Sequence, residues 1–471
     1  MITFIICLAA LITAYFTYGA YLQRQADTDD SIPTPCHRLR DGVDYLPLPR
    51  WRVFLIQLLN IAGTGPIFGA ILGACFGPVA FLWITLGGIF FGAMHDYLSG
   101  MMILRGDGRS LPEIVGDYMG NPMRHAMRYF SVVLLVLVGA VFLLSPAQLL
   151  SSMVSGSTTS MWVWIILAYY ILATLLPVDK IIGRLYPLFG IALIAMAAGL
   201  LGVLLSGAYE IPEMTTFHNF QPDPHALPII PTLFITIACG AISGFHATQS
   251  PLMARCVQNE SQCRSIFYGS MIAESIIALI WAAIAMAFFG GAGELGQALA
   301  ANDNNAAWAV DVISRSTLGK FGAVLALLGV VAAPITSGDT AFRSARLIIA
   351  DIFHLDQRPI LKRFLICIPL FIIGYLITLV NFGVVWRYFA WSNQTIGTIV
   401  LWTIYIWLAR RGRNIMIALI PAVVMTYVVT SFIFISPQFL GMTSRPAAYI
   451  LGGIATAAIT AWFIIRYRKT T

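Results

Sequence analysis

The chain has 471 residues, of which 59% are hydrophobic and only 10% are charged. Ordinary soluble domains contain about 25% charged residues, so the composition excludes a soluble protein. It predicts an all-α polytopic membrane protein, because only helices and closed barrels satisfy their backbone groups inside lipid. The formal net charge of +7 comes from 28 basic and 21 acidic residues. We interpret it as a record of membrane orientation and expect no nucleic-acid partner.

Hydrophobic runs long enough to cross a bilayer alternate with short polar connections along the chain. Each crossing needs about 20 mostly apolar residues. The first run has no basic flank before it and no small-residue cleavage site after it, so we expect a retained helix. The pattern predicts about thirteen transmembrane helices, at residues 3–22, 51–75, 79–104, 129–150, 161–177, 185–207, 228–252, 265–290, 320–345, 361–380, 384–409, 414–435 and 447–466.

The basic residues test this helix count, because Lys and Arg concentrate in cytoplasmic connections. If the N-terminus lies outside the cell, every Lys and Arg except Arg315, Lys320, Arg387 and Arg445 falls on the cytoplasmic side. A wrong count would scramble this alternation. We therefore predict that the N-terminus lies outside and the C-terminus inside, with a minor role for the basic residues in contacting anionic lipid headgroups.

Two predicted spans are interrupted near their middle by glycine, proline and polar residues. Proline removes a backbone hydrogen bond, glycine tolerates unwinding, and the freed backbone groups must face protein or a wet cavity. A packing kink explains either break alone. The candidates for a substrate site at the two breaks are Asn60, Gly63, Thr64, Gly65, Ser243, Gly244, His246, Thr248 and Gln249.

The two breaks lie five predicted spans apart, so the interrupted segments should cross the bilayer in opposite directions. Broken helices at equivalent positions of two inverted five-helix units indicate a secondary transporter with its binding site at the middle of the membrane. We divide the chain accordingly into an extra N-terminal helix with a cytoplasmic loop (1–50), a first repeat (51–207), a second, inverted repeat (208–410) and two C-terminal helices (411–471).

Three acidic residues fall within predicted spans, namely Asp96, Glu274 and Asp339. A carboxylate at that depth costs about 2.5 kcal/mol or more on insertion scales, so each needs a partner, a proton or a function. Helical spacing places Thr336, Asp339 and Arg343 on one face. This group is either a structural ion pair within one helix or a cation or proton site. The members of the candidate site are Thr336, Ser337, Asp339, Thr340 and Arg343.

The other membrane-embedded titratable residues have equally open interpretations. His95 and Asp96 can both titrate and suit a proton relay, although Asp96 could simply bond a neighbouring helix end. Glu274 has no basic residue nearby in the sequence, so it is either part of a relay or a neutral buried acid. His246 lies inside the second break, which favours a functional role over that of a hydrogen-bonded core histidine.

Neither a metal site nor an organic cofactor is expected from the sequence. The histidines show neither the spacing nor the cysteine company of a zinc site, and we interpret the seven cysteines as small core residues. The only inorganic partner expected is a coupling proton or sodium ion. An enzyme is not expected either, because the HExxH and GxSxG motifs are both absent.

Five stretches of the chain closely resemble the carbon starvation protein A (CstA) family over residues 51–400. They are Asn60-Ile-Ala-Gly-Thr-Gly-Pro-Ile, Gly77-Pro-Val-Ala-Phe-Leu-Trp, His95-Asp-Tyr-Leu-Ser-Gly-Met-Met, Ser243-Gly-Phe-His-Ala-Thr-Gln-Ser-Pro and Ile335-Thr-Ser-Gly-Asp-Thr-Ala-Phe-Arg-Ser-Ala-Arg. The resemblance implies a bacterial inner-membrane transporter with a LeuT-type fold, in which the first and sixth core helices are broken and hydroxyls of the eighth bind a coupling cation. Many members have about 700 residues, so this chain resembles a short form.

These features together predict a symporter that imports a small carboxylate-bearing nutrient, such as pyruvate, an amino acid or a short peptide, during carbon starvation. Helix N-termini at the breaks would attract the substrate carboxylate. A channel is disfavoured by the scarcity of polar stripes along the spans. The alternative that remains open is a membrane-embedded starvation sensor that binds such a ligand without transporting it. The sequence leaves the substrate, the coupling ion and the oligomeric state undetermined.

Overall fold

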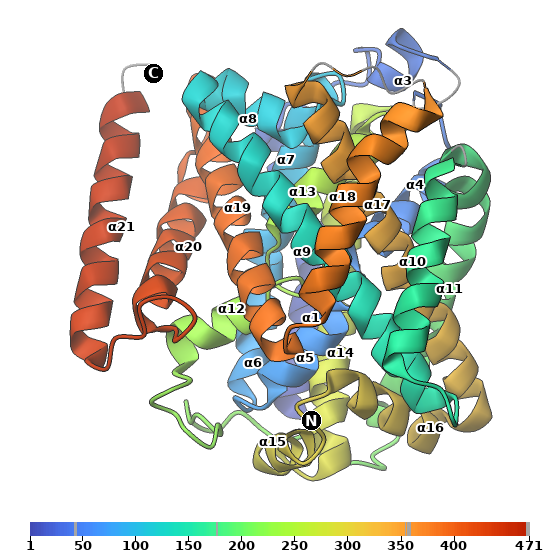
Figure 1. Cartoon of the computed structure of the whole chain (residues 1–471). Helices are drawn as coiled ribbons and strands as arrows, with labels where there is room; N and C mark the ends of the chain where they lie inside the picture. Colours follow the sequence, from blue (N-terminus) through green and yellow to red (C-terminus); the bar gives the residue numbers. More distant parts are fainter. Residues whose placement is uncertain (42–44, 176–177, 354, 356–358, 468–471) are drawn as a thin grey trace.

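The computed structural model describes residues 1–471 except 42–44, 176–177, 354, 356–358 and 468–471, and it leaves the side chains of 175–185 undescribed. The part of the chain that it describes contains helices and no strand, as the predicted all-α class requires. Long helices stand side by side in a bundle, and short helices and loops cover its two ends (Figure 1). The last two residues of the predicted span 161–177 lie outside the described residues.

The first broken rod consists of α4 (Arg50–Ile61) and α5 (Gly65–Ala74), which are bent by 48° relative to each other. Pro66 stands in the first turn of α5, where its missing N–H group is tolerated. In a continuous helix the ring of Pro66 would clash with the carbonyl of Ala62. Ala62 accordingly has non-helical dihedral angles, with φ −85° and ψ 51°. The structure thus contains the break predicted in the span 51–75.

The second broken rod is interrupted over a longer stretch. It begins with the short η2 (Ile229–Leu233) and α12 (Phe234–Thr236), and it resumes with α13 (Gly244–Ala254). The residues between, 237–243, are not helical. Ser243 caps α13 in an extended conformation, with φ −145° and ψ 122°. This is the break predicted in the span 228–252.

Three helices precede the first broken rod, and seven elements separate the two broken rods. The middle of the third predicted span is π-helical, a geometry that often marks functional sites and that the sequence did not predict. These elements are α1 (Ile2–Phe16), α2 (Tyr18–Gln25), α3 (Pro35–Arg38), α6 (Val79–Leu82), η1 (Trp83–Ala93), α7 (Met94–Arg105), α8 (Leu111–Met119), α9 (Asn121–Met153), α10 (Thr159–Leu175) and α11 (Val178–Leu205).

The helices after the second break show clear start and stop signals. Gly290 ends one of them in the left-handed conformation, and the Asn305 side chain caps the start of another by accepting from the amides of Ala307 and Trp308. These elements are η3 (Glu260–Gln262), η4 (Arg264–Tyr268), α14 (Gly269–Phe289), α15 (Ala292–Ala300), α16 (Ala306–Leu325), η5 (Ala326–Val331), α17 (Ala332–Ile352), α18 (Ile360–Thr378), α19 (Phe382–Arg410), α20 (Met416–Ile435) and α21 (Arg445–Tyr467).

The thirteen predicted ranges all contain helix, and ten of them correspond, in the part of the chain that the structure describes, to rods that are long and apolar enough to cross a bilayer. Nine rods in the described residues are long and apolar enough to cross a bilayer, and the bent pair α4–α5 makes ten. The other three ranges correspond to the 17-residue α10, the interrupted α12–α13 and the more polar α19. The protein is therefore a multi-pass membrane protein, and the count of thirteen stays a prediction.

Burial separates inner from outer helices. In the rods that contain α7, α9 and α14, 78% of the most apolar window is buried, whereas the corresponding values are 28% for α1–α2, 28% for α18 and 22% for α21. The inner helices are therefore packed around the two breaks, and the outer ones present apolar side chains to the surroundings. A helix that is apolar on its exposed face suits contact with lipid.

The two broken rods run in opposite directions through the bundle. In Figure 1, α4 and α13 lie in the upper half and α5 and α12 in the lower half, so one chain segment descends and the other ascends. The start of α1 and the end of α21 lie at opposite ends of the bundle (Figure 1). The positions of the termini fit an odd number of crossings, and the opposite directions of the rods fit the predicted inverted units. The sidedness in the membrane stays a prediction.

A buried ion pair fastens α7 to the segment before α14. Arg105 donates from Nε to Glu260 Oε1 at 2.8 Å and from Nη2 to Oε2 at 2.7 Å, and the backbone amide of Asp29 adds a third bond. Glu260 is only 1% exposed. Removing one partner of such a pair leaves an uncompensated buried charge.

We expect Glu260→Ala to lower the stability of the purified protein by about 3–5 kcal/mol, because Arg105 would lose its bidentate partner. The measurement is the midpoint of thermal unfolding in detergent. Arg315→Gln is the matched control, since the pair between Arg315 and Asp311 on α16 is exposed at the arginine and is worth about 0–1 kcal/mol. An unchanged midpoint in Glu260→Ala would contradict the structural role of this pair.

Candidate functional site

The two unwound segments meet inside the bundle. A methyl group at Gly65, in the first break, would collide with the side chain of Cys239, in the second. Gly63 faces the ring of Phe142 on α9 with equally little space. The glycines of the first break thus allow the two backbones to approach closely, and the candidate site lies where they meet.

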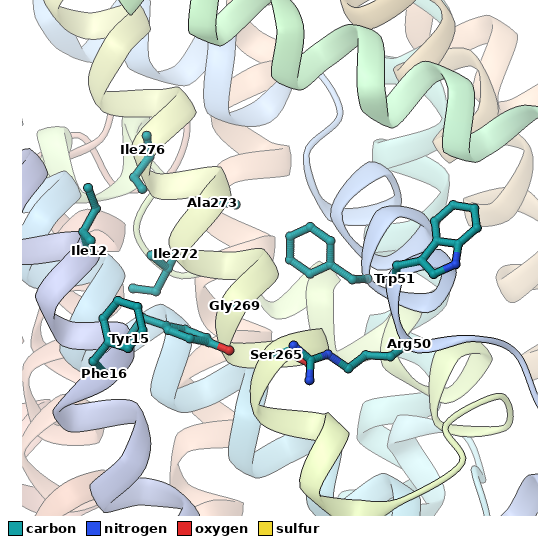
Figure 2. A pocket seen from close by; sticks show the side chains of 11 residues that line it. Ile12, Tyr15, Phe16, Arg50, Trp51, Ser265, Gly269, Ile272, Ala273 and Ile276 are labelled. Atoms are coloured by element: carbon teal, nitrogen blue, oxygen red, sulfur yellow. The ribbon is translucent and has the colours of Figure 1, made fainter.

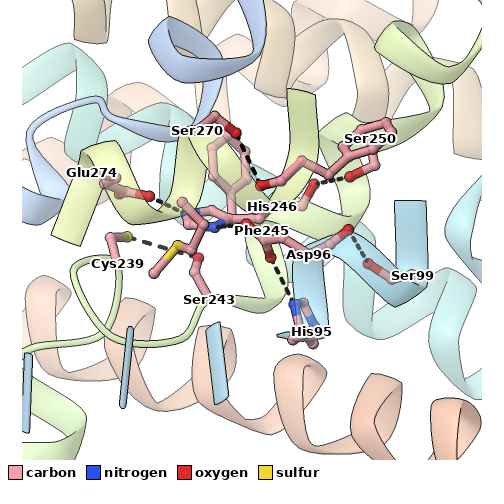
Figure 3. A network of polar contacts seen from close by, with 12 residues as sticks. His95, Asp96, Ser99, Cys239, Ser243, Phe245, His246, Ser250, Ser270 and Glu274 are labelled. Atoms are coloured by element: carbon pink, nitrogen blue, oxygen red, sulfur yellow. Dashed lines mark hydrogen bonds and ion pairs between the residues drawn. The ribbon is translucent and has the colours of Figure 1, made fainter. Parts of the chain in front are cut away.

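Asp96 is the centre of a buried polar network beside the second break. Its Oδ1 lies 2.8 Å from His95 Nδ1, and its Oδ2 lies 2.8 Å from His246 Nδ1 (Figure 3). All three side chains are fully buried. His95 and Asp96 are adjacent in the sequence and do contact each other, which their separation by about 100° around the helix did not require. The network joins α7 to the first turn of α13.

Glu274 extends this network from α14. Its Oε2 lies 3.4 Å from His246 Nε2, so the acid that lacks a basic neighbour in the sequence meets a histidine in space. Cys239 approaches the same ring, and the ligand atoms of Cys239, His246 and Glu274 all lie within 4.8 Å of one another. Among the residues that the structure describes, these three form a group that could hold a metal ion.

Asn393 forms hydrogen bonds that fix the conformation of the second break. Its Oδ1 accepts from Ser243 Oγ at 3.0 Å and from the backbone amide of Phe245 at 2.7 Å. It stands on α19, within a short polar run from Ser392 to Thr395 in the middle of a predicted span. Sequence reasoning missed this residue, and that polar run is the signal that could have identified it.

The first break holds polar groups that have no partner in the described structure. The side chain of Asn60, at the end of α4, is fully buried, and neither its oxygen nor its nitrogen forms a hydrogen bond. Gln57, one turn earlier, is in the same state. Thr64 Oγ1 lies 3.2 Å from Ser145 Oγ on α9. Buried unpaired amides are costly, so they suit a site that is completed by a polar ligand.

The remaining substrate-site candidates lie on α13. Thr248 Oγ1 donates to the carbonyl of Phe245, and Gln249 Nε2 donates to Thr248 Oγ1 at 3.1 Å. The Gln249 Oε1 atom has no hydrogen-bond partner. Thr248 also lines a cavity of about 550 Å³ whose other polar walls include Glu113 and Arg128. Thr248 therefore links the second break to the end of the bundle where α8 lies.

The structure divides the candidate cation group on α17 into two parts. Ser337 Oγ donates to the carbonyl of Leu59 beside the first break, at 3.2 Å. Asp339 instead pairs with Arg343 at 3.4 Å and lines a very small cavity with Cys367 and Phe371.

The two threonines of this group point their hydroxyls at their own helix. Thr336 donates to the carbonyl of Ala333, and Thr340 donates to the carbonyl of Ser337. Ser337 is thus the member of the predicted group that reaches the break, and Asp339 faces α10 and α18.

Cavities approach the breaks from the other end as well. One of about 400 Å³ is lined by Leu72, Thr236 and Trp386, at the ends of α5, α12 and α19. Another, of about 440 Å³, lies on the side of the bundle between α1, α4 and α14; its walls are mostly apolar around Tyr15 and Arg50 (Figure 2). The side cavity contains none of the buried network and suits a lipid-facing groove better than the candidate site.

A matched pair of glycine variants tests how tightly the second break is packed. A methyl group at Gly244 would lie 2.5 Å from the carbonyl oxygen of Asn393 and would also collide with the amide of Gly397, whereas one at Gly202 on α11 would meet nothing within 4 Å. We expect Gly244→Ala to destabilise the protein by about 1–3 kcal/mol. Gly202→Ala should leave the unfolding midpoint unchanged or raise it slightly. Equal midpoints would contradict the close packing of α13 on α19.

Comparison with known proteins decides the family. The model described as "Carbon starvation protein CstA" matches residues 1–161 and 146–318, which is more than half of the chain. The chain belongs to the CstA family. The predicted resemblance is confirmed, although it was placed at residues 51–400 and the family model begins at residue 1.

Relatives of this CstA-family chain differ in length. A membrane protein of Haemophilus influenzae is 43% identical over 339 residues, which cover 61% of this chain and 91% of that protein. The peptide transporter CstA of Bacillus subtilis is 25% identical, with 88% of this chain and 86% of that protein covered. That of Escherichia coli is 27% identical over 57% of this chain, and only 47% of it is covered, so the match spans about half the length of that relative.

Two kinds of solved structure share the fold of this CstA-family chain. A manganese transporter of Eremococcus coleocola, crystallised with an aromatic bis-isothiourea compound, aligns with a TM-score of 0.55 at 12% identity, over 92% of this chain and 99% of that one. MhsT in complex with L-phenylalanine aligns with a TM-score of 0.55 at 16% identity, over 87% and 99%. At such low identity the likeness concerns the fold alone.

Proposed function

We propose that this CstA-family protein is a secondary transporter that imports a small carboxylate-bearing nutrient, such as pyruvate, an amino acid or a short peptide, together with a proton or a sodium ion. The observation that carries the proposal is the meeting of two antiparallel broken helices inside the bundle, with unpaired polar groups at Asn60 and a buried titratable network at Asp96 and His246. Broken helices of this kind hold substrates in secondary transporters. The relatives named peptide transporters support a substrate of this class.

The substrate carboxylate binds between the breaks. The helix N-termini at Gly65 and Gly244 face this region and bring the positive ends of two helix dipoles close to it. Asn60 offers an unpaired side-chain amide, and Gln249 offers an unpaired amide oxygen. Opposite cavities of about 550 and 400 Å³ approach the breaks from the two ends of the bundle, as alternating access requires.

Coupling is assigned to the buried polar groups. Ser337 and the unwound carbonyls beside it supply oxygens to a cation, and Asp96, His95 and Glu274 carry protons. The segments 51–207 and 208–410 are inverted repeats, and one set of helices rocks against the other around the site, in the inner membrane, with the N-terminus outside. No organic cofactor takes part.

Reconstituted liposomes test the proposal. Uptake of radiolabelled pyruvate, alanine and dialanine is measured under an imposed proton gradient, an imposed sodium gradient and neither, with protein-free liposomes as the control. We expect at least one substrate to accumulate only when a gradient is present. Absence of gradient-dependent flux for all three would contradict the proposal, and tight binding without flux would favour a sensor.

Asp339→Asn tests whether the α17 ion pair takes part in coupling. Because Asp339 faces Arg343 and not the breaks, we expect the uptake rate of the folded protein to keep its dependence on the coupling ion, while the broken buried pair lowers the unfolding midpoint. The measurement is the initial uptake rate against proton and sodium concentration. A changed ion dependence would transfer the coupling role to Asp339.

A further inference from the structure

Three side chains with metal-binding atoms converge beside the breaks from separate segments. Cys239 belongs to the unwound stretch, His246 to the first turn of α13 and Glu274 to α14. Their sulfur, nitrogen and oxygen atoms lie within 4.8 Å of one another, and Figure 3 shows Glu274 and Cys239 on the same side of His246. All three residues are at most 1% exposed.

The atoms of His246 and Glu274 that face each other in this cluster are not hydrogen-bonded, whereas Cys239 Sγ donates to Ser243 Oγ at 3.8 Å. His246 Nε2, Glu274 Oε1 and Glu274 Oε2 have no hydrogen-bond partner, although they are fully buried. The contact of 3.4 Å between His246 Nε2 and Glu274 Oε2 is close enough for an ion pair but lacks hydrogen-bond geometry. Buried polar atoms nearly always have a partner, so these three atoms are suited to binding a ligand.

The spacing of these atoms matches that of two ligands on one tetrahedral metal ion. A Zn²⁺ ion binds histidine nitrogen and carboxylate oxygen at about 2.0–2.2 Å, which at a tetrahedral angle separates the two ligand atoms by about 3.4 Å. The observed separation is 3.4 Å. A thiolate, an imidazole and a carboxylate together favour a borderline-soft ion over Mg²⁺ or Ca²⁺.

The surroundings of His246 complete the pattern of a metal ligand. Asp96 Oδ2 lies 2.8 Å from His246 Nδ1, which leaves Nε2 free to bind a metal. A carboxylate behind a ligating histidine fixes its tautomer and raises its basicity. Asn393 Nδ2 donates to Cys239 Sγ at 3.8 Å, and such a donor stabilises a thiolate.

We propose that Cys239, His246 and Glu274 bind one divalent transition-metal ion, with Zn²⁺ as the best match, and that Asp96 positions His246 for this role. Three protein ligands leave a fourth position for a water molecule or a substrate oxygen. Gly65 lies against Cys239, so the ion sits between the two breaks. The sequence predicted no metal because it offers no local spacing of ligands. The proposal holds independently of transport, and with the ion bound Glu274 acts as a ligand, which leaves proton transfer to His95 and Asp96.

Metal binding is measured on the full-length protein in detergent. The tag is removed, bound metal is removed by chelation, and Zn²⁺ or Co²⁺ is then added and the excess washed away. We expect one Zn²⁺ per chain by elemental analysis, a rise in unfolding midpoint with Zn²⁺, and a thiolate-to-metal absorption band with Co²⁺. Cys239→Ser should abolish the band, and both Cys239→Ser and Glu274→Gln should weaken Zn²⁺ binding at least about tenfold. Cys75→Ser is the control, because Cys75, whose buried sulfur donates to the carbonyl of Ile71, does not belong to the cluster.

Three outcomes would overturn the proposal. They are a wild-type protein that retains no stoichiometric Zn²⁺, a Co²⁺ complex without the thiolate band, and binding equal to wild type in both cluster variants. The Co²⁺ spectrum of the wild-type protein decides the question even if a variant does not fold. A cluster that holds only protons would give the first outcome.

Discussion

Replacing Asp96 by Asn is expected to reduce the initial uptake rate at least about a hundredfold. Asp96 accepts from His95 and His246 at once, through its two carboxylate oxygens. An asparagine has one oxygen for two histidines, and it removes the negative charge that both rings face. The loss of a buried charged partner costs about 3–5 kcal/mol, and about 1.4 kcal/mol corresponds to tenfold.

The measurement is uptake into liposomes with equal amounts of inserted protein, alongside the unfolding midpoint in detergent. Asp311→Asn serves as the control, because Asp311 pairs with Arg315 on α16 and belongs to neither break. Uptake within about threefold of wild type by a folded Asp96→Asn protein would remove the network from the transport mechanism.

Asn393→Ala is expected to damage both stability and transport. The substitution leaves the hydroxyl of Ser243 and the amide of Phe245 without their acceptor, and both groups lie at the start of α13. A buried donor left unsatisfied costs about 1–3 kcal/mol. The start of α13 also positions His246, so we expect a lower unfolding midpoint and an uptake rate reduced at least about tenfold.

Asn414→Ala is the matched control for this prediction, because Asn414 is an exposed asparagine whose side chain bonds Tyr21 and the amide of Met416, away from both breaks. Its substitution should lower the midpoint by less than that of Asn393 and leave uptake intact. If Asn393→Ala behaves like Asn414→Ala in both assays, the second break does not depend on α19 for its shape.

The breaks could be predicted from the sequence because their causes are local. Pro66 and the glycines before it forbid a continuous helix over a few residues, and Gly240 to Ser243 do the same in the second rod. The family could be predicted because long motifs carry it. The pairing of Asp339 with Arg343 was likewise within reach, since four residues along a helix bring two side chains together.

The contacts between segments could not be predicted in this way. Nothing local shows that His246 meets Asp96 on another helix, or that Glu274 faces the same ring. The direction of each side chain around its helix decides such contacts, and that direction depends on the packing of the whole bundle. The same reasoning separates Ser337 from Asp339, which are two residues apart but face different neighbours. The number of crossings also could not be predicted from the local sequence where a helix is short or polar, as in α10 and α19.

The line of contacts from His95 through Asp96 and His246 to Glu274 has a mechanical consequence. The bond between Asp96 and His246 joins α7 to α13, and the contact of 3.4 Å between His246 and Glu274 joins α13 to α14. Any conformational change that preserves these links must carry the three helices as one rigid body. Sliding then occurs at interfaces such as that of α9 with α17, where Gly139 on α9 lies against the ring of Phe342 and Gly338 on α17 lies against the side chain of Phe142. Movement at this interface, beside the linked helices α7, α13 and α14, would open the cavity at one end of the bundle while it closes the cavity at the other.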